Sequence, residues 1–141
     1  MAISFDYQVQ KFLLPRQKKI VKWILLVAFL ERREVDEISY IFCESAYLLK
    51  LNRRFLHHST YTDIITFDYS VKGKLSAEIY ISIARVRENA SEFKTTFTRE
   101  LRRVMIHGVL HCIGYSDKTN RTTRIMRRKE EEYLTLFEAM E

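Results

Sequence analysis

The sequence predicts an α+β fold, in which a mixed sheet of roughly four strands has helices packed against it. Short segments rich in β-branched and aromatic residues alternate with longer segments whose apolar residues recur at helical spacing. The chain has 141 residues, 47% of them hydrophobic, which suits one packed core, so we expect residues 1–141 to form a single domain. One proline and three glycines leave little room for long linkers.

The first half of the chain predicts two strands and two helices. Residues 3–9 alternate apolar and polar side chains, which is the period of a half-buried strand. Pro15 suits the first turn of a helix that ends near Arg33. The core-facing residues of this helix are expected to be Ile20, Trp23, Ile24 and Val27. Residues 37–45 read as a second strand, and residues 44–58 as a helix. Its inward residues are expected to be Ala46, Leu49, Leu51 and Phe55.

The second half predicts a hairpin followed by helices. Residues 62–70 and 75–83 are rich in β-branched and aromatic residues, and the short turn at residues 72–74 allows these strands to pair. Helical spacing then returns in three segments: 84–93, 98–113 and 122–140. The buried stripe of the last helix is expected to contain Met126, Tyr133, Leu136 and Phe137.

Charge and cysteine content narrow the class of protein. A net charge of +6 favours an anionic partner such as nucleic acid, although surplus surface lysine and arginine would give the same value. The two cysteines, Cys43 and Cys112, form no C-x-x-C pair, which fits a reducing compartment. The longest apolar run, residues 23–30, is too short to span a bilayer, and the first residues lack a signal-peptide pattern. We therefore expect a cytoplasmic protein without a membrane partner.

The segment HGVLHCIGYSD, residues 107–117, predicts a metal site. Residues four apart lie on one face of a helix, so His107 and His111 can direct two imidazoles at one ion. Gly114 is suited to end the helix, and the returning chain can supply Asp117 as a third ligand. Two nitrogens and one oxygen leave an open coordination position, which is typical of catalytic zinc. The added carboxylate also suits another divalent metal, such as manganese, nickel or iron. Histidines on a helix surface or in the core are the alternative interpretation of the pair alone.

The same ligand spacing occurs in the metzincin proteases, which need a glutamate directly after the first histidine as general base. Here that position is Gly108, which has no side chain to move a proton. A metalloprotease is therefore a minor alternative.

The segment resembles the H-G-x-L-H-x-x-G-Y-x-H signature of the YbeY family of metal-dependent, single-strand-specific endoribonucleases. Further similarity lies in LNRRF and TDIITFDY, in AEIYIS, in ELRRVMIHGVLH and in RIMRRKEEEYL, so that it covers roughly residues 36–138. The resemblance implies a cytoplasmic Zn²⁺-dependent enzyme, with one ion per chain, that acts on single-stranded rRNA. It also implies a role in maturation of the small-subunit rRNA 3′ end and in ribosome quality control, with the ribosome or its small subunit as partner.

Two positions depart from the family pattern. The third ligand is usually histidine, whereas this chain has Asp117, which is also a legitimate zinc ligand. The family's phosphate-contacting arginine corresponds to Leu56, so that role cannot be transferred. His57 and His58 follow directly and are candidate RNA contacts, with plain solvation as the alternative.

Positive charge is concentrated around the metal motif. Nine basic residues against two acidic ones give residues 99–129 a local balance of +7. Such a concentration would attract a phosphate backbone. The candidate RNA-binding residues here are Arg103, Lys118, Arg121 and Arg124. The run of three glutamates at residues 130–132 is expected to be a solvated helix face.

The sequence assigns no general acid or base. Glu78 lies on the strand that matches a family aspartate, but a structural carboxylate is the favoured interpretation. A non-catalytic ribosome assembly factor with a structural zinc remains the main alternative to an enzyme. Nothing in the sequence indicates the oligomeric state.

Overall fold

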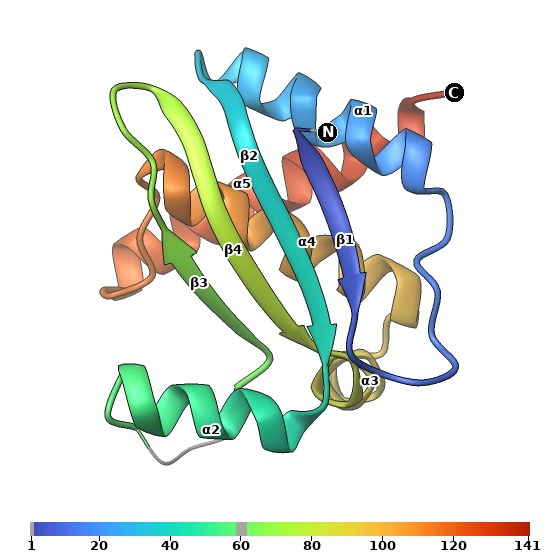
Figure 1. Cartoon of the computed structure of the whole chain (residues 1–141). Coiled ribbons are helices and arrows are strands. Elements are labelled where there is room, and N and C mark those ends of the chain that lie inside the picture. Colours follow the sequence, from blue (N-terminus) through green and yellow to red (C-terminus); the bar gives the residue numbers. More distant parts are fainter. Residues whose placement is uncertain (1, 59–61) are drawn as a thin grey trace.

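A computed structural model describes residues 2–58 and 62–141, and its elements follow the predicted order (Figure 1). The strands are β1 (Ile3–Tyr7), β2 (Glu34–Cys43), β3 (Ile64–Asp68) and β4 (Lys74–Ser82). The helices are α1 (Gln17–Leu30), α2 (Ser45–Phe55), α3 (Ile83–Glu92), α4 (Phe97–Ile113) and α5 (Asn120–Ala139). The predicted α+β class with a four-stranded mixed sheet is confirmed.

The sheet has the strand order β1-β2-β4-β3. Strand β2 pairs in parallel with both β1 and β4, whereas β3 runs antiparallel to β4. The predicted hairpin of β3 and β4 is therefore confirmed, and its turn carries Gly73 at φ 79°. Because each parallel pair needs a crossover, α1 connects β1 to β2, and the α2–β3 segment connects β2 to β4. This order leaves β3 at an edge of the sheet.

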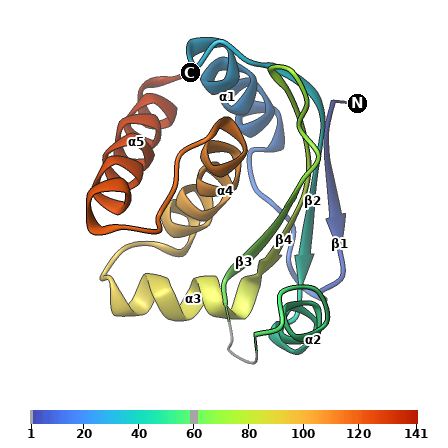
Figure 2. The same ribbon diagram turned by 90° about the vertical axis from the view of Figure 1, so that its left-hand side faces the viewer.

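Helices α1, α4 and α5 cover one face of the sheet (Figure 2). Alternate side chains of the central strands point to these helices and are buried, among them Tyr40 and Phe42 on β2 and Ile79 on β4. The Tyr40 hydroxyl donates to the main-chain oxygen of Met105 at 3.0 Å, which ties α4 to the centre of the sheet. Helix α4 lies between the sheet and α5 (Figure 2).

The predicted inward residues of α1 are all buried, as are Met126, Tyr133 and Phe137 on α5. The Trp23 indole N–H donates to the main-chain oxygen of Tyr133 at 2.7 Å and joins the two helices. Leu136 is only partly buried. None of the described helices combines the length and apolar character that crossing a bilayer requires.

Helix α2 packs on the opposite face of the sheet, over one end of β3 and β4 (Figure 1). The prediction for its inward face is partly wrong: Ala46 is exposed and Phe55 is 51% exposed, while Leu48 and Asn52 are buried. The helix touches only one end of the sheet, so one narrow stripe is enough to cover the contact. The spacing of apolar residues along this segment therefore does not single out the side chains that are buried.

Candidate metal and nucleic-acid site

Helix α4 presents both predicted histidine ligands on its side facing β3. The helix starts at Thr96, whose side chain accepts a hydrogen bond from the Arg99 N–H, and it continues through both histidines. Gly108 between them faces the sheet, because a Cβ atom there would lie 3.0 Å from Ile79 Cδ1. A glutamate at this position would meet the sheet instead of the ligands, so the general base of the metzincin pattern has no place here.

Gly114 ends α4 as predicted, with φ 126°, a conformation that disfavours side chains. Its N–H donates to the main-chain oxygens of Leu110 and His111, each at 3.1 Å. The chain then reverses, and the Thr123 hydroxyl donates to the main-chain oxygen of Asp117 at 3.0 Å. This turn brings Asp117 Oδ2 to 3.6 Å from His107 Nε2.

The loop that carries Asp117 is braced by Glu31 at the end of α1. The Glu31 carboxylate accepts hydrogen bonds from the Tyr115 hydroxyl at 2.8 Å, from Lys129 Nζ at 3.3 Å, and from the Tyr133 hydroxyl. Burial acts to raise the pKa of Glu31, but these hydrogen bonds and the Lys129 charge outweigh it and hold the pKa below its ordinary value. The Glu31 carboxylate thereby joins the loop and helix α5 to the end of α1.

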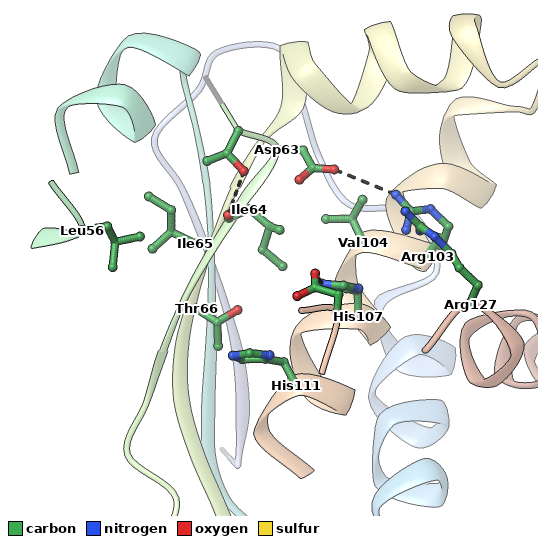
Figure 3. A pocket seen from close by; sticks show the side chains of 12 residues that line it. Leu56, Asp63, Ile64, Ile65, Thr66, Arg103, Val104, His107, His111 and Arg127 are labelled. Carbon is green, nitrogen blue, oxygen red and sulfur yellow. Dashed lines mark hydrogen bonds and ion pairs between the residues drawn. The ribbon is translucent and has the colours of Figure 1, made fainter. Parts of the chain in front are cut away.

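The predicted ligands lie in one pocket of about 410 Å³ between β3 and α4 (Figure 3). One wall consists of Leu56 and residues of the β3 segment: Thr62, Asp63, Ile64, Ile65 and Thr66. The other wall consists of helix and loop residues: Arg103, Val104, His107, His111, Asp117 and Arg127. Across the described ranges, no three histidine, cysteine, aspartate or glutamate side chains are gathered closely enough to enclose an ion. The three ligand candidates thus share a pocket without forming a closed cluster.

His107 is held by a buried carboxylate that the sequence did not assign to the site. Its Nδ1 lies 2.6 Å from Glu130 Oε2, and the Glu130 side chain is only 2% exposed. The expectation of a solvated glutamate face is therefore wrong at this residue. Burial acts to raise the Glu130 pKa, but the hydrogen bond with His107 and the charges of Arg103 and Arg127 outweigh it and keep the pKa low.

This arrangement fits a metal ligand. A histidine that binds a metal through one ring nitrogen usually gives the N–H of the other to a carboxylate, which fixes its tautomer and orientation. In this chain Glu130 accepts from Nδ1, and Nε2 is the nitrogen that points to Asp117. The donor set of two imidazoles and one carboxylate also suits zinc.

Arg103 lines the pocket but is already paired. Its guanidinium contacts both Glu100 oxygens at 2.8 and 2.6 Å, Glu130 at 3.0 Å and Asp63 at 3.9 Å. Burial acts to lower its pKa, but these carboxylates outweigh it and raise the pKa. Arg103 therefore shapes the pocket wall through its ion pairs, and an RNA phosphate would have to share its guanidinium.

Acidic residues of α5 neutralise part of the predicted basic cluster. Arg99 pairs with Glu131 at 2.8 Å and with Glu138 at 3.0 Å. Arg127 pairs with Glu130 at 2.9 Å. These glutamates follow the basic stretch in sequence, but in the folded chain they contact its arginines. The charge balance of residues 99–129 alone could not reveal these contacts.

The other RNA-binding candidates are exposed and lie outside the pocket lining. Lys118, Arg121 and Arg124 form no ion pair with the described residues and follow Asp117 by one, four and seven residues. His57 and His58 are exposed beyond the end of α2, directly after Leu56, which lines the pocket. Positive charge without an ion-pair partner among the described residues thus remains on the loop after Asp117 and on the first turns of α5.

Sequence reasoning missed Glu130, Arg127 and the β3 wall. Glu130 had a detectable signal, since it stands four residues after Met126 and three before Tyr133, on the buried stripe of α5. Glu78, by contrast, accepts a hydrogen bond from the Tyr69 hydroxyl at 3.1 Å and is not among the pocket residues.

Comparison with known proteins agrees with this picture. Residues 4–138 match the family model described as Endoribonuclease YbeY. A protein named Endoribonuclease YbeY from Flavobacterium psychrophilum is 48% identical over 135 residues, which cover 96% of each chain. One of the same name from Christiangramia forsetii is 48% identical over 126 residues, covering 89% of this chain and 88% of that protein. The solution structure of TM1509 from Thermotoga maritima superposes with a TM-score of 0.64 at 26% identity, covering 96% of this chain and 88% of that one.

Proposed function

The chain belongs to the YbeY family of endoribonucleases, and from that premise we propose that it is a zinc-dependent endoribonuclease specific for single-stranded RNA. Its substrate would be rRNA, and its partner would be the ribosome or the small subunit. It would act in maturation of the 3′ end of the small-subunit rRNA and in ribosome quality control. The observation that carries the proposal is the shared pocket of His107, His111 and Asp117, in which a buried glutamate orients His107.

His107, His111 and Asp117 would hold the zinc ion. When bound, zinc supplies a Lewis acid for a phosphoryl oxygen and lowers the pKa of water. Glu130 keeps the Nδ1 proton of His107 in place, so that Nε2 is available as a ligand. Asp117 contributes the negative charge that a third histidine would not, which lowers the net charge of the loaded site by one.

Exposed cations on the chain that follows Asp117 would draw in the RNA backbone. Lys118, Arg121 and Arg124 have no acidic partner among the described residues, so their charges are available to phosphates. Leu56 gives the pocket an apolar edge where the family pattern has an arginine. We therefore expect these three cations to carry backbone binding.

The test combines metal analysis with RNA cleavage. Zinc content is measured by mass spectrometry for the wild type, Asp117→Ala, His111→Ala and the control Asp36→Ala, an exposed aspartate on β2 outside the pocket lining. Each protein is then given a labelled single-stranded RNA and its duplex, with chelator and after zinc is restored. We expect the wild type and Asp36→Ala to bind one zinc and cut only the single strand, and the two ligand variants to lose both properties.

Two outcomes would overturn the proposal. Stoichiometric zinc with RNA binding but no metal-sensitive cleavage would favour the assembly factor. Cleavage of casein would favour the protease. The chemistry of the product ends separates two routes, since a cyclic phosphate indicates attack by the RNA 2′-hydroxyl and a 5′-phosphate indicates attack by water.

Backbone binding has its own measurement. The salt dependence of RNA affinity should become shallower by roughly one unit of slope for each of Lys118→Ala, Arg121→Ala and Arg124→Ala. Lys22→Ala, an exposed lysine on α1, is the control and should leave the slope unchanged. Equal slopes in all four variants would show that RNA binds elsewhere.

A further inference from the structure

We propose that the free edge of β3 holds the phosphodiester backbone of the RNA beside the pocket, with the main-chain N–H groups of Ile64 and Thr66 donating to phosphate oxygens. This inference rests on the proposed function and adds a binding surface to it. It follows from the position of β3, from its pairing register and from the groups that its edge presents.

Strand β3 is an edge strand, with β4 on one side and no strand of residues 2–58 or 62–141 on the other. Figure 2 looks onto this edge, which borders the space between the sheet and α4. Ile64, Ile65 and Thr66 line the pocket, and Figure 3 shows Ile64 and Thr66 opposite the two histidines of α4. A chain that entered the pocket would therefore run along β3.

The register fixes which main-chain groups face outward. The Ser82 N–H donates to the Asp63 oxygen at 2.9 Å, and the Tyr69 N–H donates to the Ser76 oxygen at 2.7 Å. In an antiparallel pair, hydrogen-bonded and non-hydrogen-bonded positions alternate, so the odd-numbered residues of β3 bond to β4. Ile64 and Thr66 direct their N–H and C=O groups to the free edge.

The edge presents more donors than acceptors. The Thr62 hydroxyl donates to the Ile64 oxygen at 3.2 Å and occupies one lone pair of that acceptor. Within the described part of the chain, the N–H groups of Ile64 and Thr66 meet no acceptor. Two residues of a strand span about 6.8 Å, so the two donors form a short row.

This edge also lacks the usual protection. Exposed edge strands are commonly blocked by lysine, proline or a bulge, which prevent pairing with other chains. The sequence of β3 is IITFD, and its pairing with β4 shows no register shift. An open edge beside a functional pocket is expected where the edge binds a substrate.

The groups on the edge favour a phosphate backbone over a peptide. An added peptide strand needs donors and acceptors in alternation, whereas a phosphate accepts only. The Ile64 oxygen already accepts from Thr62, which leaves only one of its two lone pairs for a peptide N–H. The opposite wall contributes the guanidinium groups of Arg103 and Arg127, which already pair with Glu130, so a phosphate would share them with that carboxylate.

The test compares Thr66→Pro with Thr66→Val. Valine keeps the N–H and removes only the hydroxyl, whereas proline removes the N–H as well. Proline is tolerated on an edge strand where the N–H points away from the ladder. Phe67→Pro checks the register, because its N–H points to β4, so this variant should lose thermal stability while Thr66→Pro keeps it.

Binding is measured with a fluorescent single-stranded RNA that carries 2′-deoxy substitutions and with zinc present. We expect the RNA affinity of Thr66→Pro to be roughly tenfold or more below that of Thr66→Val, because the loss of one hydrogen bond to a charged group typically has an effect of about this size. The loss of affinity should be equal for RNAs of different base sequence. If Thr66→Pro does not fold, an ester in place of the same amide removes the N–H without the ring.

Several results would overturn the inference. Equal affinities of the proline (or ester) and valine variants would show that the edge does not bind the backbone, and a loss restricted to certain bases would indicate base contacts instead. Casein cleavage that depends on the Thr66 N–H would assign the edge to peptides. Failure of the wild type to bind or cut RNA would count against the proposed function, whereas wild-type activity with unaffected variants would count against this inference alone.

Discussion

Replacing Glu130 by glutamine should weaken both zinc binding and the fold. The substitution keeps the size of the side chain but removes the charge that His107, Arg103 and Arg127 share. Loss of a carboxylate behind a metal-binding histidine typically lowers metal affinity 10- to 100-fold, or about 1.4 to 2.7 kcal/mol. Glutamine can still accept one hydrogen bond, so the loss should lie within this range.

The effect on stability follows from the same contacts. Removing one partner of a buried ion pair costs about 3–5 kcal/mol when the other charge is left alone. Arg103 keeps both contacts with Glu100, and the Arg127 side chain is 55% exposed to water, so neither arginine is left buried without a partner. We therefore expect a loss of about 2–3 kcal/mol in the free energy of unfolding, which lowers Tm by roughly 8–12 °C.

The assay uses Glu131→Gln as the matched control. Glu131 is the neighbouring residue, but its side chain is 63% exposed and pairs with Arg99 on the surface, so its substitution should cost less than about 1 kcal/mol. Zinc affinity is measured by competition with a chromophoric chelator, and stability by urea unfolding of the zinc-free proteins. Equal zinc affinity in the two variants would refute the positioning role of Glu130.

Three further predictions concern the framework of the site. Gly108→Ala should lower the free energy of unfolding, measured in urea, by about 1 kcal/mol. The new methyl group would lie 3.0 and 3.2 Å from Ile79 atoms, and this crowding outweighs the better helix propensity of alanine. A more stable variant would contradict this. Glu31→Gln should destabilise the protein most at neutral pH and progressively less below about pH 4.5. A carboxyl group whose pKa is lowered in the folded state stabilises the fold only while it is ionised. A stability difference between the variant and the wild type that does not change with pH would exclude this explanation. Trp23→Phe should lower the free energy of unfolding, measured by thermal unfolding, by about 2–3 kcal/mol. It removes the 2.7 Å hydrogen bond to Tyr133 and part of the packing on Phe137. A loss of stability below about 0.5 kcal/mol would show that the hydrogen bond is dispensable.

The parts of the structure that depend on local spacing could be predicted from the sequence. Two histidines one turn apart, a glycine that ends the helix and an aspartate three residues later are set by chain geometry, and all three side chains reach one pocket. The strand pattern and the short turn at Gly73 likewise predicted the hairpin that forms one wall.

The missed features depend on contacts between distant segments. Glu130 reaches His107 only because α5 packs against α4, and Arg99 loses its free charge to Glu131 for the same reason. The buried face of α2 depends on which end of the sheet the helix meets, so Leu48 is buried in place of Ala46. A short stretch of sequence contains the residues of one helix or strand. These contacts depend on how two such elements are placed relative to each other.

The ion pairs of Arg103 have a consequence for the proposed binding of zinc. One guanidinium joins Glu100 on α4, Glu130 on α5 and Asp63 at the start of the β3 segment, and none of these bonds involves a metal. The back of the cavity should therefore keep the same shape before and after an ion arrives. Structural change on loading should be confined to the short reversal after Gly114, which makes backbone amide signals of residues 114–119 the natural reporters of occupancy.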